Sequence, residues 1–533
     1  MASSAGRYDV IIIGGGINGA GVARDAALRG LEVLLLEQKD FGSGTSSWSS
    51  RLIHGGLRYL EYGQIPLVYE SLRERRILRR TAPHLVKRIR INIPVYDYSK
   101  RGMLMLRAGM IAYDLLSMRK TLPRHRVLNR KEFLQHAPGV NASGLRGGVQ
   151  YFDAQVAFAE RLVIENIIAA SAAGAAVKNY SPVTAIDIQN RQVCRVRYVD
   201  GDTGSAVEAE ARAVINATGP WVDRVLAMAN VPMSKLMGGT KGSHIVIGRF
   251  AGAPRDVFYV EAHADGRPFF IIPWNDQYLI GTTDTRYDGD PGEASTTSEE
   301  IAYLLSETNR IFPGAQLQEK DIHFTYAGVR PLPYMSAGPE SAITRKHIIE
   351  RHENAKNLWS VIGGKLTTYR NLSEKIVDRI VEASGLRAAA CSTRDQNLPG
   401  ATSMDAAEER LGEIEDLSPR GRERILDVYG SRVHEILHLA GGGREQCAPV
   451  DPLNSVLAAE IRLAIRHEFA RNLVDILHRR TMTGLSSDLG ASVAQGIADV
   501  AADELGWDEV EKARQLQALG DYNARLKVPG TAD

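Results

Sequence analysis

The chain has 533 residues, which is too long for one hydrophobic core, so two or three domains are expected. Hydrophobic residues make up 44% of the sequence and charged residues 24%, ordinary values for a globular protein. The formal net charge of +2 is too small to indicate nucleic-acid binding, although it can hide a local basic patch.

The three cysteines, Cys194, Cys391 and Cys447, are far apart and lack metal-ligand spacing. Neither a disulfide framework nor a metal site is therefore predicted. No apolar run approaches the roughly 18–20 residues that cross a bilayer. The start of the chain has no basic and apolar stretch typical of a cleaved secretory signal, so export by such a signal is not expected.

The N-terminal segment predicts a parallel βαβ unit. Residues 8–13 form an apolar run typical of a buried strand, residues 17–28 follow as a helix, and residues 32–36 form a second strand. Residues 71–90 are a strongly basic helix candidate, which Pro83 is expected to break.

The middle of the chain changes from a mixed pattern to short strands. Residues 157–170 look helical, residues 193–199 form a strand, and another strand ends at residues 214–216. Four short strands then follow, with a hairpin turn around Asn275 and Asp276. These strands are expected at residues 244–247, 257–260, 269–272 and 278–280. They predict a separate antiparallel sheet, and residues 403–526 predict a helical C-terminal domain.

The turn after the first strand satisfies GxGxxG through Gly14, Gly16 and Gly19, and Glu37 stands eighteen residues further on. The strand before it and the helix after it supply the context that this motif requires. Gly14 permits the tight turn, Gly16 lets the backbone approach a pyrophosphate, and Gly19 lets helix and strand pack closely. The free N–H groups of the helix N-terminus favour phosphate, and Glu37 suits ribose hydroxyls and disfavours a 2′-phosphate. These residues predict a bound dinucleotide without separating FAD from NAD.

Further motifs occur in a fixed order along the chain. They are Thr45-Ser46-Ser47, Ile53-His54-Gly55-Gly56-Leu57-Arg58-Tyr59-Leu60, Asn216-Ala217-Thr218-Gly219-Pro220-Trp221, Lys241-Gly242-Ser243-His244, Gly281-Thr282-Thr283-Asp284, Gly328-Val329-Arg330-Pro331-Leu332 and Gly363-Gly364-Lys365-Leu366-Thr367-Thr368-Tyr369-Arg370. This ordered set resembles the FAD-dependent, membrane-associated glycerol-3-phosphate dehydrogenases, which belong to the D-amino-acid-oxidase-like flavoproteins.

The resemblance implies FAD as the cofactor and sn-glycerol 3-phosphate as the substrate, which is oxidised to dihydroxyacetone phosphate while electrons pass through FAD to a membrane quinone. It also implies a set of cofactor-binding residues, in part already indicated by the dinucleotide motif. They are Gly14, Gly16, Asn18, Gly19, Glu37, Thr45, Ser46, Ser47, Thr218, Gly219, Gly364, Lys365, Leu366 and Thr367.

Oxidation of this substrate requires side chains that bind its phosphate and a base that accepts the proton of its C2 hydroxyl. Arginine and lysine suit phosphate because their charge-assisted hydrogen bonds are strong and directional. The substrate-binding residues expected from the motifs are Arg58, Tyr59, Arg330, Arg345 and Lys365. His244 is the favoured base and His54 the second candidate, since histidine titrates near neutral pH. Arg330 is also expected to orient the C2 hydroxyl and to stabilise the developing alkoxide.

The implied fold class is α/β plus α: a Rossmann-like FAD-binding domain, an antiparallel-sheet substrate domain and a C-terminal helical domain. We expect the FAD-binding domain at residues 1–95, 150–230 and 345–397. The substrate domain, with a membrane-facing segment, is expected at 96–149 and 231–344, and the helical domain at 398–533. Homodimerisation is a candidate role for the helical domain.

Residues 95–126 combine apolar and basic side chains. Apolar residues concentrate between 103 and 118, and the basic residues around them are Lys100, Arg101, Arg107, Arg119, Lys120, Arg124 and Arg126. This pattern is typical of a helix in the interface of an anionic membrane, although an ordinary core helix with solvated ends has the same composition. With the resemblance, it predicts a cytoplasmic protein bound peripherally to the inner face of the cytoplasmic membrane.

Three alternatives remain open. A glycerol-3-phosphate oxidase would give the electrons to O₂ and release hydrogen peroxide, and it would share most of these motifs. An amine oxidase of the same superfamily would use the arginines for a carboxylate. A flavoprotein that binds FAD without turnover is the third. A nucleic-acid partner is not expected, because no RNA- or DNA-binding motif is present.

Overall fold

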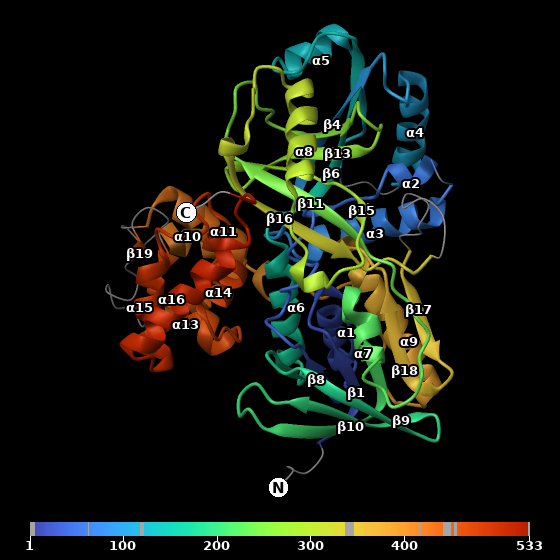
Figure 1. Ribbon diagram of the computed structural model, residues 1–533, viewed down its shortest axis with the longest axis vertical. Coiled ribbons are helices and arrows are strands. Elements are labelled where there is room, and N and C mark those ends of the chain that lie inside the picture. Colours follow the sequence, from blue (N-terminus) through green and yellow to red (C-terminus); the bar gives the residue numbers. More distant parts are fainter. Residues whose placement is uncertain are drawn as a thin grey trace.

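The computed structural model describes residues 6–61, 63–117, 122–335, 346–412, 414, 417–440, 449–451 and 456–530, without the side chain of Arg58. Two large sheets lie end to end, and a group of helices from the C-terminal part lies beside them (Figure 1). The expected residues Arg345, Arg119 and Lys120, and also Cys447, lie outside the described residues.

The first sheet carries the predicted βαβ unit. Its order is β17-β18-β10-β1-β2-β7, with β8 and β9 added beside β10. The strand bounds are β1 (Gly6–Ile13), β2 (Val33–Leu36), β7 (Ala176–Lys178), β8 (Val183–Gln189), β9 (Gln192–Val199), β10 (Ala206–Asn216), β17 (Ile348–His352) and β18 (Ala355–Ile362). Strand β1 pairs in parallel with β2 and β10, so the predicted parallel βαβ unit is confirmed.

Three helices pack together beside this sheet (Figure 1). They are α1 (Ile17–Leu28), α6 (Ala159–Ala172) and α9 (Tyr369–Ser384). Helix α1 is buried on most of its surface, because its small side chains Ala20, Ala23 and Ala27 let it contact both neighbours. Two short elements, η1 (Gly219–Trp221) and α7 (Val222–Leu226), follow β10 in the chain.

The second sheet has ten strands in the order β15-β11-β14-β13-β12-β4-β6-β3, with β16 beside β11 and β5 beside β6. The bounds are β3 (Leu52–Ile53), β4 (Val86–Tyr96), β5 (Arg126–Asn129), β6 (Leu145–Val156), β11 (Thr240–Ile247), β12 (Val257–Glu261), β13 (Pro268–Trp274), β14 (Gln277–Gly281), β15 (Thr285–Arg286) and β16 (Ile322–Arg330). The four predicted short strands are confirmed as parts of β11 to β14. Asn275 and Asp276 both have positive φ, as a tight hairpin requires.

The predicted basic helix at residues 71–90 is wrong in its second half. Helix α3 (Ile65–Thr81) ends two residues before Pro83, and β4 begins at Val86. The apolar side chains of Ile91, Ile93 and Val95 are buried at alternate positions of β4, which pairs with β6 over eleven residue pairs. In the sequence, the nearby basic residues hide the alternating apolar pattern that is typical of a strand.

Smaller elements surround the second sheet. They are α2 (Arg58–Glu61), α4 (Met103–Leu116), α5 (Arg130–His136), α8 (Ser298–Ile311), η2 (Pro291–Glu293), η3 (Glu319–Asp321) and η5 (Leu366–Thr368). The domain boundaries stay a prediction. Sheet membership favours placing β4 and β6 with the substrate domain, although the expected boundaries put most of both in the FAD-binding domain.

The C-terminal part is almost entirely helical, as predicted. Its elements are η6 (Pro399–Ala401), α10 (Met404–Gly412), α11 (Pro419–Tyr429), η7 (Gly430–Arg432), α12 (Val433–Leu439), α13 (Ala458–His467), α14 (Leu473–Asp475), a π-helix η8 (Ile476–Arg480), η9 (Thr483–Leu485), α15 (Ala494–Leu505), α16 (Glu509–Ala524) and a two-stranded sheet of β19 (Pro449–Asp451) and β20 (Val456–Leu457). Apolar residues of α10, α11 and α13 share a core cluster with the second sheet, so the helices pack directly on it.

Candidate active site

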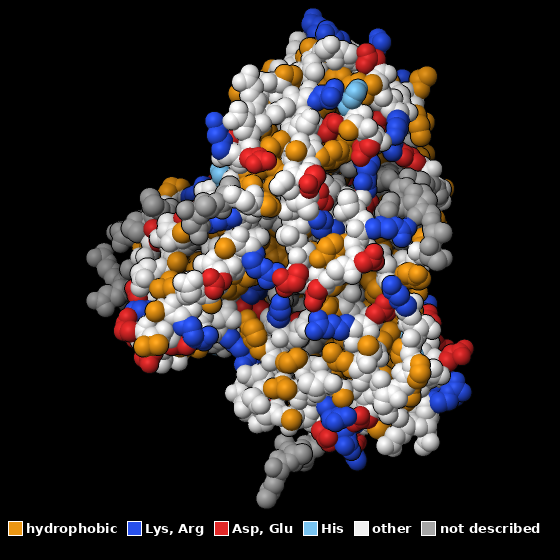
Figure 2. Space-filling view, viewed as in Figure 1, with side chains coloured by type: hydrophobic (Ala, Val, Ile, Leu, Met, Phe, Trp, Pro, Cys, Tyr) orange, Lys and Arg blue, Asp and Glu red, His pale blue; other side chains and the backbone are white. Residues whose placement is uncertain are grey.

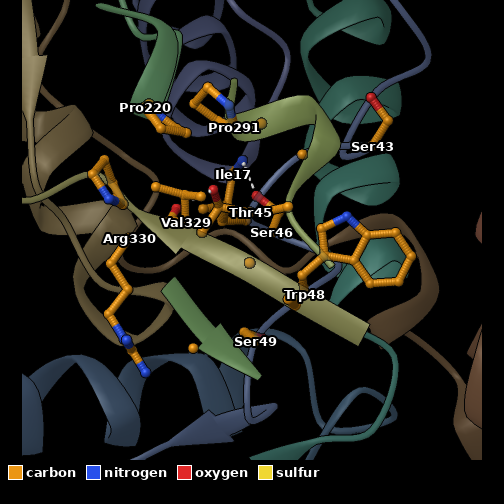
Figure 3. Close-up of a pocket in the computed structure, with 18 of the residues that line it drawn as sticks. Ile17, Ser43, Thr45, Ser46, Trp48, Ser49, Pro220, Pro291, Val329 and Arg330 are labelled. Atoms are coloured by element: carbon orange, nitrogen blue, oxygen red, sulfur yellow. Dashed lines mark hydrogen bonds between the residues drawn. The ribbon is translucent and has the colours of Figure 1, made fainter. Parts of the chain in front are cut away.

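A cavity of 1420 Å³ runs between the two sheets and reaches the C-terminal helices. Gly14, Gly16 and Glu37 line one part of it, and His244 and Arg330 line another. In Figure 3, Ile17, Thr45 and Ser46 lie together, while Arg330 extends away from them. The cavity is therefore long enough to connect the dinucleotide motif with the residues expected to act on substrate.

The glycine turn before α1 has no room for side chains. Gly14 has φ +106°, and a Cβ on it would lie 2.8 Å from the carbonyl oxygen of Ala217. A Cβ on Gly19 would lie 1.8 Å from the carbonyl oxygen of Gly14, so Gly19 serves helix–strand packing, and it does not line the cavity. The turn thus exposes backbone at the start of α1, as a pyrophosphate site requires.

Glu37 is held in place by backbone N–H groups. One carboxylate oxygen accepts from Gly15 N at 2.7 Å and the other from Lys39 N at 2.9 Å. Both bonds orient the carboxylate beside the glycine turn, where ribose hydroxyls of an adenosine would lie.

The hydroxyl side chains of Thr45, Ser46 and Ser47 have two different roles. Ser46 Oγ accepts from the N–H of Ile17 at 3.0 Å (dashed in Figure 3), and Thr45 Oγ1 donates to the carbonyl of Val329 at 2.8 Å. Both residues line the cavity. Ser47 does not: its buried hydroxyl donates to the carbonyl of Gly42 at 2.7 Å. A direct cofactor contact from the Ser47 side chain is therefore not supported.

The remaining expected cofactor residues meet at the cavity from distant segments. Asn18, Thr218, Gly219, Gly364, Lys365, Leu366 and Thr367 all line it. Gly364 has φ +99°, and a Cβ there would lie 2.8 Å from Asn18 Nδ2. Gly363 and Gly364 form a turn before η5, which leads directly into α9. The glycine turns, the N-terminus of α1 and the Glu37 carboxylate form a cradle, and this cradle fits FAD.

Arg330 lies at the end of β16, and its guanidinium is fixed by several acceptors. Nη1 donates to Asp284 Oδ1 at 2.9 Å, and Nη2 donates to Thr282 Oγ1 and the carbonyl of Thr283, both at 3.0 Å. Asp284 also pairs with Arg267, whose Nη2 lies 3.1 Å from Oδ2. One carboxylate is thus shared by two guanidinium groups at this end of the cavity.

Lys365 and Tyr59 lie together on the cavity wall. The Lys365 ammonium stands 3.7 Å from the centroid of the Tyr59 ring, a cation–π distance. His54 also lines the cavity, and its backbone N–H donates to Thr367 Oγ1 at 3.2 Å. The structure therefore brings Tyr59, Lys365 and His54 to one cavity with Arg330. Arg345 and the side chain of Arg58 lie outside the described residues.

His244 projects from β11, between Gly281 of β14 and Tyr326 of β16. Its side chain is almost fully buried, and Nε2 lies 2.9 Å from Ser50 Oγ. Burial first, and the charges of Arg330 and Arg51 second, lower the pKa of His244 to about 3. His244 is therefore neutral across the physiological pH range, and a neutral imidazole is the form that accepts a proton.

Several wall residues did not stand out in the sequence. Ser50 and Arg51 lie three and four residues after the Thr45-Ser46-Ser47 motif, so closeness to that motif is the one signal that could have indicated them. Arg267 has no motif around it. The helical domain also contributes Asn472, Arg479 and Tyr522 to the cavity, which no local pattern predicts.

Side chains of the helical domain form hydrogen bonds with the loop that follows Glu37. Asp40 is fully buried and accepts from Arg479 Nε at 2.6 Å and from both terminal nitrogens of Arg480 at 2.8 Å. These arginines hold the pKa of Asp40 far below its usual range. Asn179 donates to the same carboxylate at 3.1 Å. The C-terminal helices therefore support the segment beside the ribose position.

These features define an FAD-dependent oxidoreductase, and comparison with known proteins agrees. The family described as FAD dependent oxidoreductase matches residues 9–369, and the C-terminal domain of alpha-glycerophosphate oxidase matches residues 391–512. The glycerol-3-phosphate dehydrogenase of Synechocystis is 45% identical, with 98% of this chain and 97% of the relative covered. That of Mycobacterium leprae is 34% identical, with 98% and 88% covered.

Solved structures give the same result. The glycerol-3-phosphate dehydrogenase from Bacillus halodurans, complexed with FAD, aligns with a TM-score of 0.80 and 27% identity over 100% of this chain and 97% of that chain. A glycine oxidase from Geobacillus kaustophilus shares the fold over 74% of this chain and 99% of its own, with a TM-score of 0.55 and 20% identity. The chain belongs to the FAD-dependent glycerol-3-phosphate dehydrogenases. The cofactor is FAD, and the predicted fold class is confirmed.

Proposed function

We propose that this protein oxidises sn-glycerol 3-phosphate to dihydroxyacetone phosphate, with FAD as hydride acceptor, and passes the electrons to a membrane quinone. The observation that carries the proposal is the single cavity that joins the FAD cradle to Arg330, His244 and Lys365. The names of the relatives support the same substrate.

The charge of the substrate end suits a phosphate ester. Arg330 and Arg267 share the one carboxylate of Asp284, and Lys365 adds a further cation on the wall. A phosphate dianion pairs with cations of this kind, and its oxygens accept the directional hydrogen bonds of a guanidinium. We assign Arg330, Lys365 and Tyr59 to substrate binding, and Arg58 and Arg345 remain proposed members of the same site.

Proton removal from the C2 hydroxyl is assigned to His244. When bound, FAD supplies the hydride acceptor for the hydrogen on C2. The neutral imidazole of His244 takes up the hydroxyl proton, while the guanidinium of Arg330, fixed by Asp284 and Thr282, stabilises negative charge on the substrate oxygen. His54 holds the Thr367 hydroxyl and is assigned to positioning or to proton handling at the same end.

A quinone acceptor is supported by an apolar surface on α4. Leu104 is 83% exposed and Leu115 63% exposed, and Met105 and Ile111 are also exposed. Ile65 and Tyr69 of the neighbouring α3 are exposed as well. Orange side chains line the upper right edge of Figure 2, where Figure 1 places α4. Exposed Arg107, Arg124 and Arg126 stand near this surface in sequence.

This combination suits a helix that lies in the interface of an anionic membrane and gives the enzyme access to quinone. In the residues that the structure describes, no helix combines the length and the apolar character that crossing a bilayer requires. We therefore propose peripheral binding to the inner face of the cytoplasmic membrane. Flotation with anionic liposomes at low salt tests it: the protein is expected to float, and a protein that stays at the bottom contradicts membrane binding.

An oxidase that uses O₂ is the second candidate, because the C-terminal domain matches that of alpha-glycerophosphate oxidase. Turnover with glycerol 3-phosphate in air, with and without a soluble quinone, separates the two. The dehydrogenase is expected to reduce quinone much faster than it forms hydrogen peroxide. Peroxide formed in step with dihydroxyacetone phosphate, and unaffected by quinone, would instead establish the oxidase.

A further inference from the structure

The imidazole of His244 has one nitrogen that is closed to any ligand. Its Nδ1 is sealed from solvent and has no hydrogen-bond partner among the described residues. The Tyr326 ring covers the imidazole at a centroid distance of 4.8 Å, and Gly281 lies against its other edge. A proton that enters from the cavity therefore has to reach Nε2.

Nε2 is in turn occupied by Ser50. The Ser50 hydroxyl lies 2.9 Å from Nε2, and although both residues line the cavity, His244 is only 2% exposed while Ser50 is partly exposed. The Ser50 hydroxyl can accept one proton and donate another, so it offers a route for a proton from the cavity to Nε2 of His244.

Ser50 is held in this position from both sides. The next residue, Arg51, has φ +56°, a left-handed conformation that is unfavourable for a long side chain. Its fully buried guanidinium forms two hydrogen bonds with Glu160, at 2.7 and 2.8 Å, and stacks 4.6 Å from the centroid of Trp274. On the other side, Tyr326 donates its hydroxyl to the carbonyl of Ser49 at 2.9 Å.

We propose that Ser50 is a catalytic proton relay between the substrate hydroxyl and His244, an inference that rests on the proposed function. As the C2 hydrogen leaves with its electron pair, the substrate O–H proton passes to Ser50 Oγ. In the same step the Ser50 proton passes to Nε2 of His244, so the serine stays neutral and the imidazole gains one proton. The relay requires the tautomer with hydrogen on Nδ1 and a lone pair on Nε2.

Replacement of Ser50 by alanine tests the relay in the FAD-loaded enzyme. Flavin reduction by glycerol 3-phosphate, followed anaerobically by stopped flow, is expected to slow about 100-fold or more in S50A, the usual size of a lost proton-transfer catalyst. Flavin content and substrate affinity are expected to stay close to wild type. S50T keeps the hydroxyl and is expected to retain most of the rate. S49A is the matched control, because Ser49 Oγ accepts from Arg51 N and does not contact His244.

A pH profile separates a relay from a merely structural role. The titratable groups around His244 are Arg330, Arg51 and Tyr326, and burial raises the pKa of the Tyr326 phenol. None of them titrates between pH 5 and 8, so the wild-type rate at saturating substrate is expected to be flat there. Without the relay the proton leaves to water or hydroxide, and the S50A rate is expected to rise with pH. An S50A enzyme as fast as wild type, or an equally slow S49A enzyme, overturns the relay.

The tautomer can be read without any substrate, which separates failure of the relay from failure of the proposed function. Nitrogen NMR of the [¹⁵N]histidine-labelled holoenzyme is expected to show a protonated Nδ1 and an unprotonated Nε2 for His244 at neutral pH. The S50A spectrum assigns the signal. Hydrogen on Nε2 in the wild type contradicts the relay, even if glycerol 3-phosphate reduces the flavin.

Discussion

Replacing Arg330 by lysine keeps the positive charge at the substrate end but removes the guanidinium fork. In the native protein four acceptors fix the two terminal nitrogens at 2.9–3.3 Å: Asp284 Oδ1, Thr282 Oγ1, the carbonyl of Thr283 and Thr240 Oγ1. A lysine ammonium is a single point, and we expect Asp284 to draw it away from the substrate. One charge-assisted hydrogen bond contributes about 1.5–3 kcal/mol, so the second-order rate of flavin reduction is expected to fall about 10- to 150-fold.

The assay is anaerobic stopped flow over a range of glycerol 3-phosphate concentrations, with flavin content measured alongside. Arg267 provides the matched control, because it binds the same carboxylate but its side chain is 38% exposed. Exposed pairs contribute about 0–1 kcal/mol, so R267K is expected to lose less than about fivefold. Wild-type kinetics in R330K, or equal losses in both variants, would refute the role given to Arg330.

Three further predictions follow from the structure. His244→Gln is expected to slow flavin reduction about 10²- to 10⁴-fold without loss of FAD. Burial lowers the pKa of His244 to about 3. The wild-type rate at saturating substrate, where the second ionisation of the phosphate (about pH 6) no longer enters, should therefore be flat around pH 6.5, and an inflection there in the stopped-flow profile would contradict this. Asp40→Asn removes the carboxylate to which the fully buried Arg480 donates two hydrogen bonds. The free energy of unfolding should therefore fall by about 3–5 kcal/mol and FAD should be released at lower temperature. An unchanged melting curve would contradict the support of the cofactor loop by these arginines. Leu104→Glu with Leu115→Glu should abolish liposome flotation and slow quinone reduction, while anaerobic flavin reduction stays the same; unchanged flotation would contradict the membrane surface.

The sequence predicts the elements that depend on local pattern. The βαβ unit combines a strand period, three glycines and Glu37 within a short segment, and the structure confirms it. The hairpin at Asn275 and Asp276 is similarly local, since it needs only two residues that tolerate positive φ. Both features rest on backbone geometry that neighbouring residues alone impose.

Contacts between distant segments could not be predicted in this way. Asp40 and Arg480 are 440 residues apart, and nothing near either residue indicates the other. The first part of β4, residues 86–90, falls within the predicted basic helix because basic residues hide its alternating positions, whereas pairing with β6 decides its structure. Ser50 has a role only because β11 places His244 beside it.

The same distant contacts give the helical domain a structural link to the active site. Glu468 pairs with Arg161 at 2.6 Å, and the preceding residue, Glu160, holds Arg51 beside Ser50. All four charged side chains are buried. Removal of one partner leaves a buried charge uncompensated, which is costly. The C-terminal helices therefore stabilise both the cofactor loop and the loop that holds Ser50.

The most direct test of the central claim is anaerobic titration of the purified FAD-loaded protein with glycerol 3-phosphate. The cavity that joins the FAD cradle to Arg330 and His244 predicts that the oxidised flavin absorbance is bleached and that dihydroxyacetone phosphate forms in equal amount. Glycerol, which lacks the phosphate, should leave the spectrum unchanged at the same concentration. A flavin that stays oxidised with glycerol 3-phosphate, or that glycerol bleaches equally well, would contradict the assignment.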